Sequence, residues 1–249
     1  MKISRNLLAA SVCMLTAAPV MADPPKEDGL WRGALSASLA LAAGNTQSTN
    51  FSIGTTALKA TKEDKLSLFL TSLYGTREDA GKTVKTANQT RGGGKYDWNL
   101  SDRSYAFGIL ELEQDKLSSL DLRTVAGAGL GLKLVKEKDI AFEVFGGITQ
   151  NHEKYARSSR NATELMLGEQ SDHKLSESTS FKQRLAFFPN LKNSGEYRAQ
   201  FDAGLVTSIA SGINLQVTLS NRYDSQAPLG TKKTDTLLLT GINIAFGAR

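Results

Sequence analysis

The feature that most constrains this chain is a two-residue alternation of polar and apolar side chains, which recurs along almost all of it from Leu30 onward. It is clearest from Tyr197 to Leu205, where Tyr, Ala, Phe, Ala and Leu alternate with Arg, Gln, Asp and Gly. Alternation of this kind is typical of β-strands with one apolar and one polar face, and helical periodicity is scarce. The sequence therefore predicts an all-β fold.

Turn signals rich in Gly, Asn and Asp divide this pattern into twelve predicted strands. The first covers Trp31–Ala43 and the last Thr234–Phe246. An even number of strands lets an antiparallel sheet close into a barrel with both termini on one side. The eighth, Thr163–Gln170, alternates least clearly, so a barrel of ten strands is the alternative.

The connections between the predicted strands fall into two classes. Every second connection is tight, at 62–65, 99–102, 135–139 and 210–212, and the one near 171–178 is intermediate. The others are mostly longer, at 75–86, 151–162, 189–196 and 223–235, with 44–48 as the exception. Short turns on the periplasmic side and longer loops outside are typical of transmembrane barrels of the outer membrane. The pattern favours such a barrel over a soluble β-sandwich.

The last predicted strand has the character of a barrel-closing strand. One face carries Leu238, Ile242, Ile244 and Phe246. The other face carries Asp235, Gly241 and Asn243, with Leu237 and Leu239 as apolar exceptions. We expect this strand to pair with Trp31–Ala43 and seal the barrel. Its ending, with Gly241, Ile244 and Phe246, resembles the signal that the barrel-assembly machinery reads, except that three residues follow the aromatic.

The N-terminus predicts a cleaved secretory signal peptide over residues 1–22. Lys2 and Arg5 form its charged region, Leu7 to Ala18 its apolar region, and Val20-Met21-Ala22 a small-residue cleavage site. Residues 23–29 then form a short periplasmic lead-in, and the predicted barrel occupies residues 30–249. No later segment offers the roughly 20 consecutive apolar residues of a membrane helix, but a membrane strand needs only about 9–11 residues.

The mature chain is nearly balanced in charge and has no cysteine. Lys2 and Arg5 are two of the 30 basic residues, so 28 remain against 25 acidic ones. This mild balance argues against a nucleic-acid partner. Because an exported protein without disulfides needs another source of stability, a large hydrogen-bonded sheet is the expected one.

Charged residues of both signs fall on the predicted inward faces. They are Arg91, Lys95, Asp97, Glu111, Glu113, Arg123, Lys133, Glu143, Lys182, Arg184, Arg198, Asp202, Arg222 and Asp235. Opposite charges can pair across the lumen and fill it, or they can line a hydrated channel. Twelve strands lie between small barrels filled by side chains and the open porins of 16–18 strands. A filled or narrow lumen is therefore favoured.

A barrel enzyme would need a histidine and a serine two residues apart on one strand, pointing the same way. The mature chain has two histidines, in His152-Glu153-Lys154 and His173-Lys174-Leu175, and neither segment fits. The carboxylates Glu111 and Glu113 are better explained as ion-pair partners. No metal-ligand spacing is present. The sequence therefore assigns no catalytic, metal-binding or cofactor-binding residue, and no cofactor.

Several motifs resemble those of the salt-induced outer-membrane proteins, a domain family of unknown function. They are Trp31-x-Gly33, Ala43-Gly44-Asn45-Thr46, Glu113-x-Asp115, Asp121-x-Arg123, Gly127-x-Gly129-x-Gly131 and Tyr223-Asp224 with the following Leu229-Gly230 and Thr234-Asp235-Thr236. The resemblance covers nearly the whole mature chain. It implies an outer-membrane barrel of Gram-negative bacteria without established enzymatic activity, and it offers no catalytic residues to carry over.

We therefore expect a non-enzymatic outer-membrane barrel that is either structural or a narrow channel for small solutes or ions. The family name alone adds a link to salt or osmotic stress. The expected partners are outer-membrane lipids and, during biogenesis, the barrel-assembly machinery. The alternatives are a barrel enzyme acting on lipid and a soluble periplasmic β-protein that binds a ligand in its core.

Overall fold

A computed structural model describes residues 26–42, 47–79, 81–227 and 233–248 of the chain. The predicted signal peptide at 1–22 and the first residues of the predicted lead-in, 23–25, lie outside these ranges, so both stay predictions. Within the described ranges, no helix is long and apolar enough to cross a membrane.

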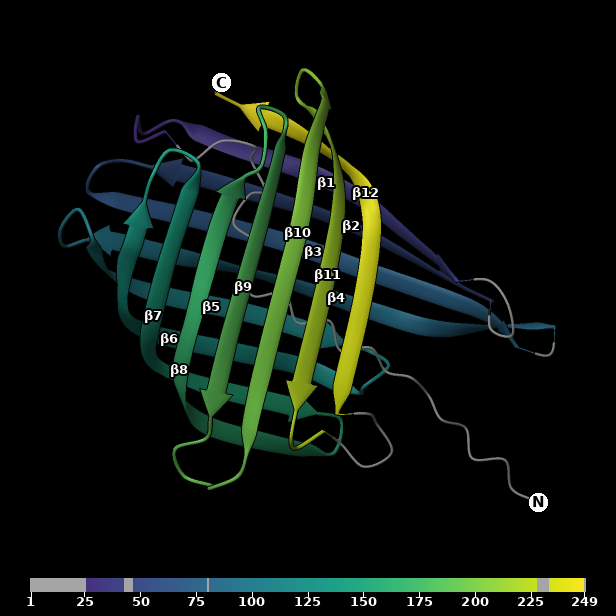
Figure 1. Ribbon diagram of the computed structural model, residues 1–249. Helices are drawn as coiled ribbons and strands as arrows, with labels where there is room; N and C mark the ends of the chain where they lie inside the picture. Colours follow the sequence, from purple (N-terminus) through teal and green to yellow (C-terminus); the bar gives the residue numbers. More distant parts are fainter. Residues whose placement is uncertain (1–25, 43–46, 80, 228–232, 249) are drawn as a thin grey trace.

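Twelve antiparallel strands form one closed barrel, in which each strand pairs with the next and β12 pairs with β1 (Figure 1). The strands are β1 Trp31–Ala42, β2 Gln47–Ala60, β3 Asp64–Asp79, β4 Lys82–Asn99, β5 Ser104–Asp115, β6 Leu120–Lys136, β7 Ile140–Tyr155, β8 Ser158–Lys174, β9 Thr179–Pro189, β10 Tyr197–Ala210, β11 Ile213–Asp224 and β12 Thr234–Gly247. The predicted all-β barrel of twelve strands is confirmed, and the ten-stranded alternative is wrong.

The first and last strands meet in a continuous seam. Their register runs from Arg32 opposite Gly247 to Leu39 opposite Thr240. The predicted pairing of the two strands is therefore confirmed. Both ends of the barrel chain lie at one end of the molecule, which also holds the turns after β2, β4, β6, β8 and β10. We call this the even-turn end and the opposite one the odd-turn end.

Two predicted loops are wrong, because the strands continue through them. β3 and β4 stay paired up to Asp79 opposite Lys82, within the predicted loop 75–86. β7 and β8 stay paired up to Tyr155 opposite Ser158, within the predicted loop 151–162. Polar cross-strand contacts support these extensions, for example the Thr83 hydroxyl donating to Glu78 Oε1 at 2.8 Å. The longer odd-turn connections that remain are those after β9 and β11.

The outer face of the barrel is apolar. Its exposed residues include Leu35, Leu39, Ile53, Leu68, Leu70, Leu110, Leu112, Leu130, Leu132, Ile148, Leu167, Leu185, Leu205, Leu215, Leu238, Ile242 and Ile244. Exposed aromatic residues lie towards both ends of the strands. Trp31, Tyr96, Trp98 and Phe246 lie near the even-turn end, and Phe51, Tyr74, Phe187 and Tyr197 near the odd-turn end. An apolar band between two aromatic girdles is the surface of a transmembrane barrel.

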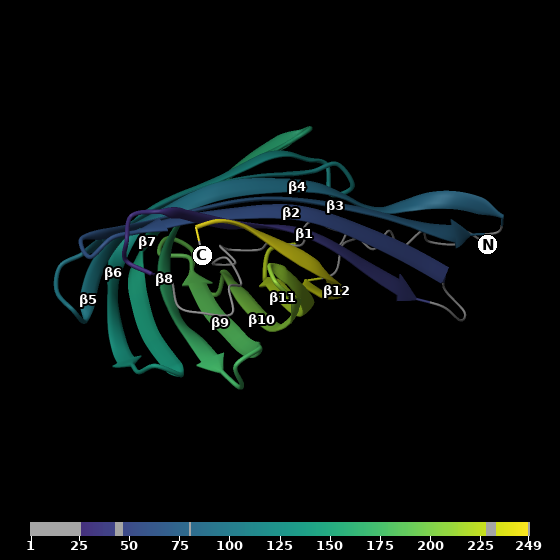
Figure 2. The ribbon, with the colours of Figure 1, turned by 90° about the horizontal axis from the view of Figure 1, so that it is seen from above.

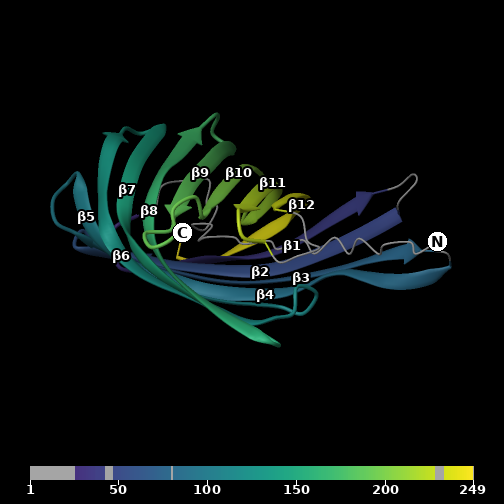
Figure 3. The same cartoon turned by 90° about the horizontal axis from the view of Figure 1, so that it is seen from below.

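The barrel wall is uneven in length. β1 to β4 form a long wall that projects beyond the other strands at the odd-turn end, whereas β5 to β12 curve around to complete the barrel (Figures 2 and 3). β4 has 18 residues and β5 only 12, and their pairing begins at Gln89 opposite Asp115. The part of β4 before Gln89 therefore extends past the end of β5.

Candidate functional site

One side of the barrel lumen is filled by an apolar cluster that β5, β7, β8 and β9 supply. Its members are Tyr105, Phe107, Ile109, Phe145, Met166, Ala186 and Phe188, and each is at most 7% exposed. Tyr105 and Phe107 share the inward face of β5 with Glu111, so the inner face of this strand changes from aromatic to acidic along its length. A hydrated lumen cannot extend through this side of the barrel.

Cationic side chains cover the aromatic rings of this cluster. The ammonium of Lys95 lies 4.7 Å from the ring centre of Tyr105 and 5.0 Å from that of Phe107. The guanidinium of Arg184 lies 4.6 Å from the ring centre of Phe145, and that of Arg198 lies 4.8 Å from Phe188. Such cation–π contacts place positive charges inside the barrel at a reduced desolvation cost.

Buried ion pairs complete the filled side. Arg91 pairs with Glu111 on the neighbouring strand. Arg123 bridges two carboxylates, with Nη1 2.8 Å from Glu113 Oε2 and Nε 3.1 Å from Glu153 Oε1. Because an unpaired buried charge is strongly unfavourable, this pairing lets so many charges remain inside the barrel.

Two further pairs connect the filled side to the rest of the wall. Arg198 on β10 donates to both carboxylate oxygens of Glu164 on β8, at 2.9 and 2.5 Å, across the intervening β9. Arg222 on β11 donates to Asp202 on β10 through Nη2, at 2.5 and 2.6 Å.

Most of the charged residues predicted to face inward are brought together in this way. Asp97 lies between Lys95 and Lys65, at 2.6 and 3.0 Å. Lys133 Nζ donates to Asn99 Oδ1 at 3.0 Å, and Lys182 pairs with Asp172 at 3.1 Å. Glu143 lines a cavity at the even-turn end. Asp235 is the register partner of Arg222, but its side chain lies outside the described part of the structure.

Sequence reasoning missed several members of these pairs, namely Lys65, Glu153 and Glu164. Glu153 is not recognised as an inward-facing residue because the sequence predicts a loop over residues 151–162. The signal that could have found it is the continued alternation on β7, where Asn151 and Glu153 follow Thr149 on the buried face.

The opposite side of the lumen contains a cavity. A cavity of about 120 Å³ lies inside the barrel between β1 to β3 and β8 to β12. The polar side chains of its inward-facing lining include the hydroxyl and amide groups of Ser36, Ser38, Ser52, Thr56, Thr71, Gln170, Gln216, Thr218 and Asn243, and the charged groups of Asp172, Lys182, Arg184 and Asp202. We call this cavity the polar chamber.

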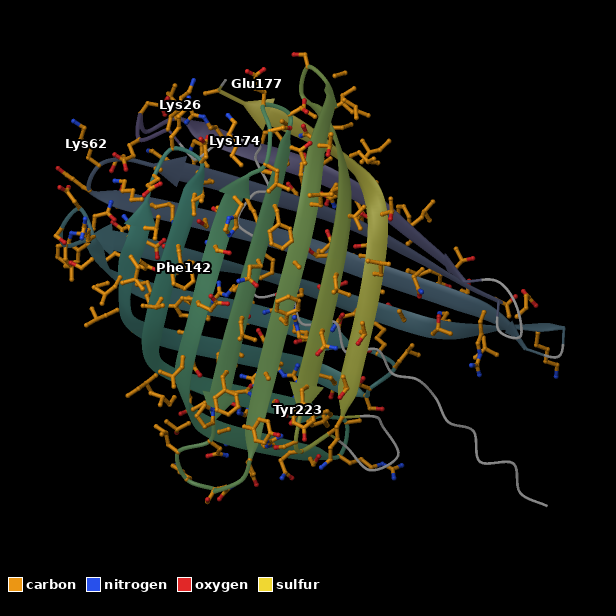
Figure 4. All side chains as sticks on the ribbon, in the orientation of Figure 1. Lys26, Lys62, Phe142, Lys174, Glu177 and Tyr223 are labelled. Carbon is orange, nitrogen blue, oxygen red and sulfur yellow. The ribbon has the colours of Figure 1, made fainter. Side chains whose placement is uncertain are left out.

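A second cavity of about 220 Å³ opens at the even-turn end. Gln170, Asp172 and Lys182 line both this mouth cavity and the polar chamber, so the two adjoin. Charged side chains surround this end of the molecule, with Lys26, Lys62, Lys174 and Glu177 visible there, whereas Tyr223 lies at the opposite end (Figure 4).

Towards the odd-turn end the lumen narrows to an apolar contact. Leu73 on β3 and Ala87 on β4 are buried together, and Leu237 on β12 packs against them. Since β1 and β2 separate β12 from β3 along the wall, this contact joins inward-facing side chains across the interior. We call it the leucine constriction.

The lead-in is attached to the mouth by an ion pair. Both carboxylate oxygens of Asp28 accept hydrogen bonds from the Arg32 guanidinium, at 2.7 and 2.5 Å. This hydrogen bonding from Arg32, together with the backbone N–H of Leu30, holds the pKa of the Asp28 carboxyl well below its ordinary value. Glu27 approaches Lys136 at 3.9 Å. The lead-in therefore lies beside the mouth cavity, which Glu27 helps to line.

The structure also contains a serine–histidine pair that sequence reasoning missed. Ser171 precedes His173 by two residues on β8, and His173 Nε2 lies 3.1 Å from Ser171 Oγ. This serine precedes its histidine, so it lies outside the predicted segments His152-Glu153-Lys154 and His173-Lys174-Leu175. Ser171 faces outward in the row of Phe142 and Gln183 and is only 4% exposed. A nucleophile must reach its substrate, so this burial favours a positioning contact over a catalytic one.

His152, the other histidine, is exposed and bonded to Asn161. Over the described ranges, no group of three or more His, Cys, Asp or Glu residues is arranged to hold a metal ion.

Comparisons with known proteins give a family and several structures of similar shape. The model of a family described as "Protein of unknown function, DUF481" matches residues 35–246. The KdgM porin is 10% identical, with 86% of this chain and 99% of that chain covered at a TM-score of 0.49. The NanC porin is 11% identical, with 87% and 97% covered at a TM-score of 0.46. The translocator domain of the autotransporter NalP from Neisseria meningitidis is 11% identical, with 90% and 89% covered at 0.44. No curated protein matches the chain.

Proposed function

The chain belongs to a family of proteins of unknown function, DUF481, and we propose that it is a non-enzymatic barrel of the bacterial outer membrane whose narrow lumen passes small polar solutes or ions. The predicted membership of a domain family of unknown function is thereby confirmed, whereas the salt-induced name stays a prediction. Because the family description assigns no activity, the proposal rests on the geometry of the barrel.

The outer face supports a membrane location. Exposed leucines and isoleucines surround the barrel, and the exposed fraction reaches 62% at Leu130 and 57% at both Ile148 and Leu238. A soluble monomer rarely leaves contiguous apolar patches larger than a few hundred Å². This band disfavours the alternative of a soluble periplasmic β-protein. Cell fractionation tests the location: recovery in the soluble periplasmic fraction, without heat-modifiable gel migration, would contradict it.

The single observation that carries the channel proposal is the polar chamber. Its hydroxyl and amide groups can replace the hydration of a small solute, as the polar linings of selective pores do. It adjoins the mouth cavity through Gln170, Asp172 and Lys182, and this gives a polar route from the even-turn end into the lumen. The filled side limits the width of this route, so any passage is narrow.

Single-channel recording in planar bilayers tests the proposal. We expect small, reproducible conductance steps from the folded protein. Thr218→Phe places a ring in the polar chamber and should remove them, because Thr218 lines that chamber. Thr240→Phe is the matched control, since Thr240 lies beside Val217 on the adjoining strand and is exposed on the outer face. Absence of conductance from correctly folded protein would contradict an open passage.

A second candidate is a purely structural barrel with a closed lumen. The apolar cluster, the buried ion pairs and the leucine constriction favour this candidate, because together they occupy much of the interior. The same recordings distinguish the two candidates. A folded and inserted protein that never conducts, with Thr218→Phe indistinguishable from the parent, supports the structural barrel.

We extend the proposal to salt or osmotic stress, because a passage for small solutes would alter how the periplasm equilibrates with its surroundings. The test is growth of a deletion strain in high salt and in sucrose of equal osmolarity. A defect in both media supports an osmotic role, and a defect in salt alone supports an ionic one. Unchanged growth in both would contradict the link.

A further inference from the structure

A polar strip interrupts the apolar outer face on β8 and β9. Glu169, Ser171 and His173 occupy alternate positions on β8. They continue the outward face of the strand on which Leu167 lies, 46% exposed. Gln183 on β9 donates from Nε2 to Glu169 Oε1 at 3.0 Å. Polar and ionisable groups facing lipid are costly in a transmembrane barrel, and they mark functional positions.

An apolar groove adjoins this strip. Leu130 and Leu132 on β6, Val144 and Gly146 on β7, and Leu167 on β8 line it on the outer face, with a volume of about 710 Å³.

Gly146 provides the floor of the groove. It lies between Leu130 and Leu167 in the sheet register, so two leucines flank a position without a side chain. A Cβ added there would meet Leu167 Cδ2 at 3.5 Å, which is ordinary contact. The groove therefore has room for apolar atoms.

The sheet register brings the groove and the strip together. Glu169 lies opposite Val144, which lies opposite Leu132. Glu169 therefore lies in one line across the sheet with Val144 and Leu132, both of which line the groove. Phe142 and Ser171 form the next row towards the even-turn end. Glu169 lies two register positions further from that end than Phe142.

The charge of Glu169 indicates what fits beside the groove. Its side chain accepts a hydrogen bond from the amide of Gln183, and among the described residues no Lys, Arg or His forms an ion pair with it. An ionised carboxylate only accepts hydrogen bonds, whereas a primary ammonium offers three N–H donors. Hydrogen bonds between such charged groups are about twice as strong as neutral ones.

We propose that this outer surface binds one phospholipid whose head group carries a primary ammonium. An acyl chain occupies the groove over Gly146, and the ammonium donates to the carboxylate of Glu169. The hydrogen bond between Ser171 Oγ and His173 Nε2 fixes the imidazole of His173 beside the head group. The inference rests on the outer-membrane location proposed above, but it does not depend on whether the lumen conducts.

Native mass spectrometry of the membrane-extracted protein tests the proposal. The probes are phosphatidylethanolamine and phosphatidylcholine with identical acyl chains, which differ in whether the nitrogen can donate hydrogen bonds. We expect one retained ethanolamine lipid, bound about tenfold more tightly than the choline lipid, as one charge-assisted hydrogen bond implies. Equal retention of the two lipids would overturn the proposal.

Three variants divide the site into its parts. Glu169→Gln should reduce ethanolamine binding to the choline level. Gly146→Leu should weaken the binding of both lipids, because the new leucine side chain fills the groove. Ala37→Leu places the same side chain at an exposed position on β1, away from the groove, and should change the binding of neither lipid. If the Glu169→Gln variant still prefers the ethanolamine lipid over the choline lipid, the proposed contact between the ammonium and Glu169 is wrong.

Heat-modifiable migration verifies that each variant is a folded barrel. If fractionation places the parent protein outside the membrane, the proposed location fails. If the parent inserts but shows no lipid preference, only the lipid site fails.

Discussion

The phenyl ring of Phe246 on β12 lies over Gly33, its register partner on β1, at the outer side of the closing seam. A Cβ on Gly33 would collide with this ring and with the Thr56 carbonyl. On the inner side of the same seam, Gly241 lies against the Ala37 carbonyl and the backbone of Ser38. The seam is therefore close-packed on both faces, and it depends on small residues at fixed positions. The role of Gly241, Ile244 and Phe246 in assembly stays a prediction.

Gly241→Ala should weaken the seam, because the added Cβ meets backbone atoms that cannot rotate away. Overpacking of this kind costs about 1–3 kcal/mol. Gly204→Ala is the control, since the nearest atom to its added Cβ is the Val217 carbonyl oxygen at 4.0 Å. Urea unfolding in bilayers, followed by heat-modifiable migration, measures the difference. Equal stability of the two variants would contradict the close packing.

Leu237→Ser should raise the conductance of the barrel, because it removes the apolar contact of Leu237 with Leu73 and Ala87. Hydrophobic constrictions block ions by excluding water, so a hydroxyl there should hydrate the passage. We expect an increase of at least about twofold in single-channel recordings. Leu238→Ser changes the adjacent leucine, which is 57% exposed on the outer face, and should leave conductance unchanged. An equal effect of the two substitutions would exclude the constriction.

Arg198→Met should destabilise the barrel by about 3–5 kcal/mol, because it leaves the carboxylate of Glu164 buried without its main cation. The side chains of the pair are only 6% and 2% exposed. The double variant Arg198→Met with Glu164→Leu should recover most of this loss, since the carboxylate that lost its cation is removed as well. Urea unfolding in bilayers compares the two. A double variant no more stable than the single one would show that burial of the lone carboxylate is not the cause.

The Asp28–Arg32 contact should be lost at acidic pH. The pKa of Asp28 is lowered in the folded protein, so its contribution is fully present above the ordinary value of 3.8 and disappears as the pH falls through the lower folded value. The carboxyl carbon shift of Asp28, followed by NMR, should titrate below pH 3.8. In the Arg32→Gln variant it should titrate closer to that value. A midpoint at or above 3.8 in the parent protein would contradict the contact.

The faces of most strands could be predicted from the sequence because their alternation is a local property. In β10, Arg198 and Gln200 are buried while Tyr197 and Leu205 are exposed, as the two-residue period predicts. The exceptions Leu237 and Leu239 on β12 have a physical reason. Both point into the lumen, where Leu237 packs against Leu73 and Ala87. Because these two residues lie on β3 and β4, far from β12 in the sequence, the local pattern of β12 does not reveal the contact.

Strand length could not be predicted where both faces are polar. β3 and β4 continue through residues that alternate in no apolar pattern, held by the ladder and by contacts such as Thr83 to Glu78. The eighth strand was predicted at Thr163–Gln170 and extends over Ser158–Lys174 for the same reason. Composition marks such segments as loops, although the backbone pairs fully.

The pairing of the lumen charges depends on geometry that a sequence does not display. Arg198 reaches Glu164 across β9, which requires the stagger between three strands. The contact between Ser171 and His173 is different, because its two-residue spacing is visible in the sequence. The segment Ser171-Asp172-His173 displays it directly.

The projection of the long wall beyond β5 leaves part of the sheet with an open edge. Among the described residues, pairing with β5 begins at Gln89, so residues 82–87 of β4 have a neighbouring strand on the β3 side alone. An open edge is a template for the addition of a strand from another chain. Lys82 and Lys85 lie on this edge, and their charges oppose indiscriminate pairing. A barrel normally abolishes such edges by closure, and this one retains a short, charged one beyond its odd-turn rim.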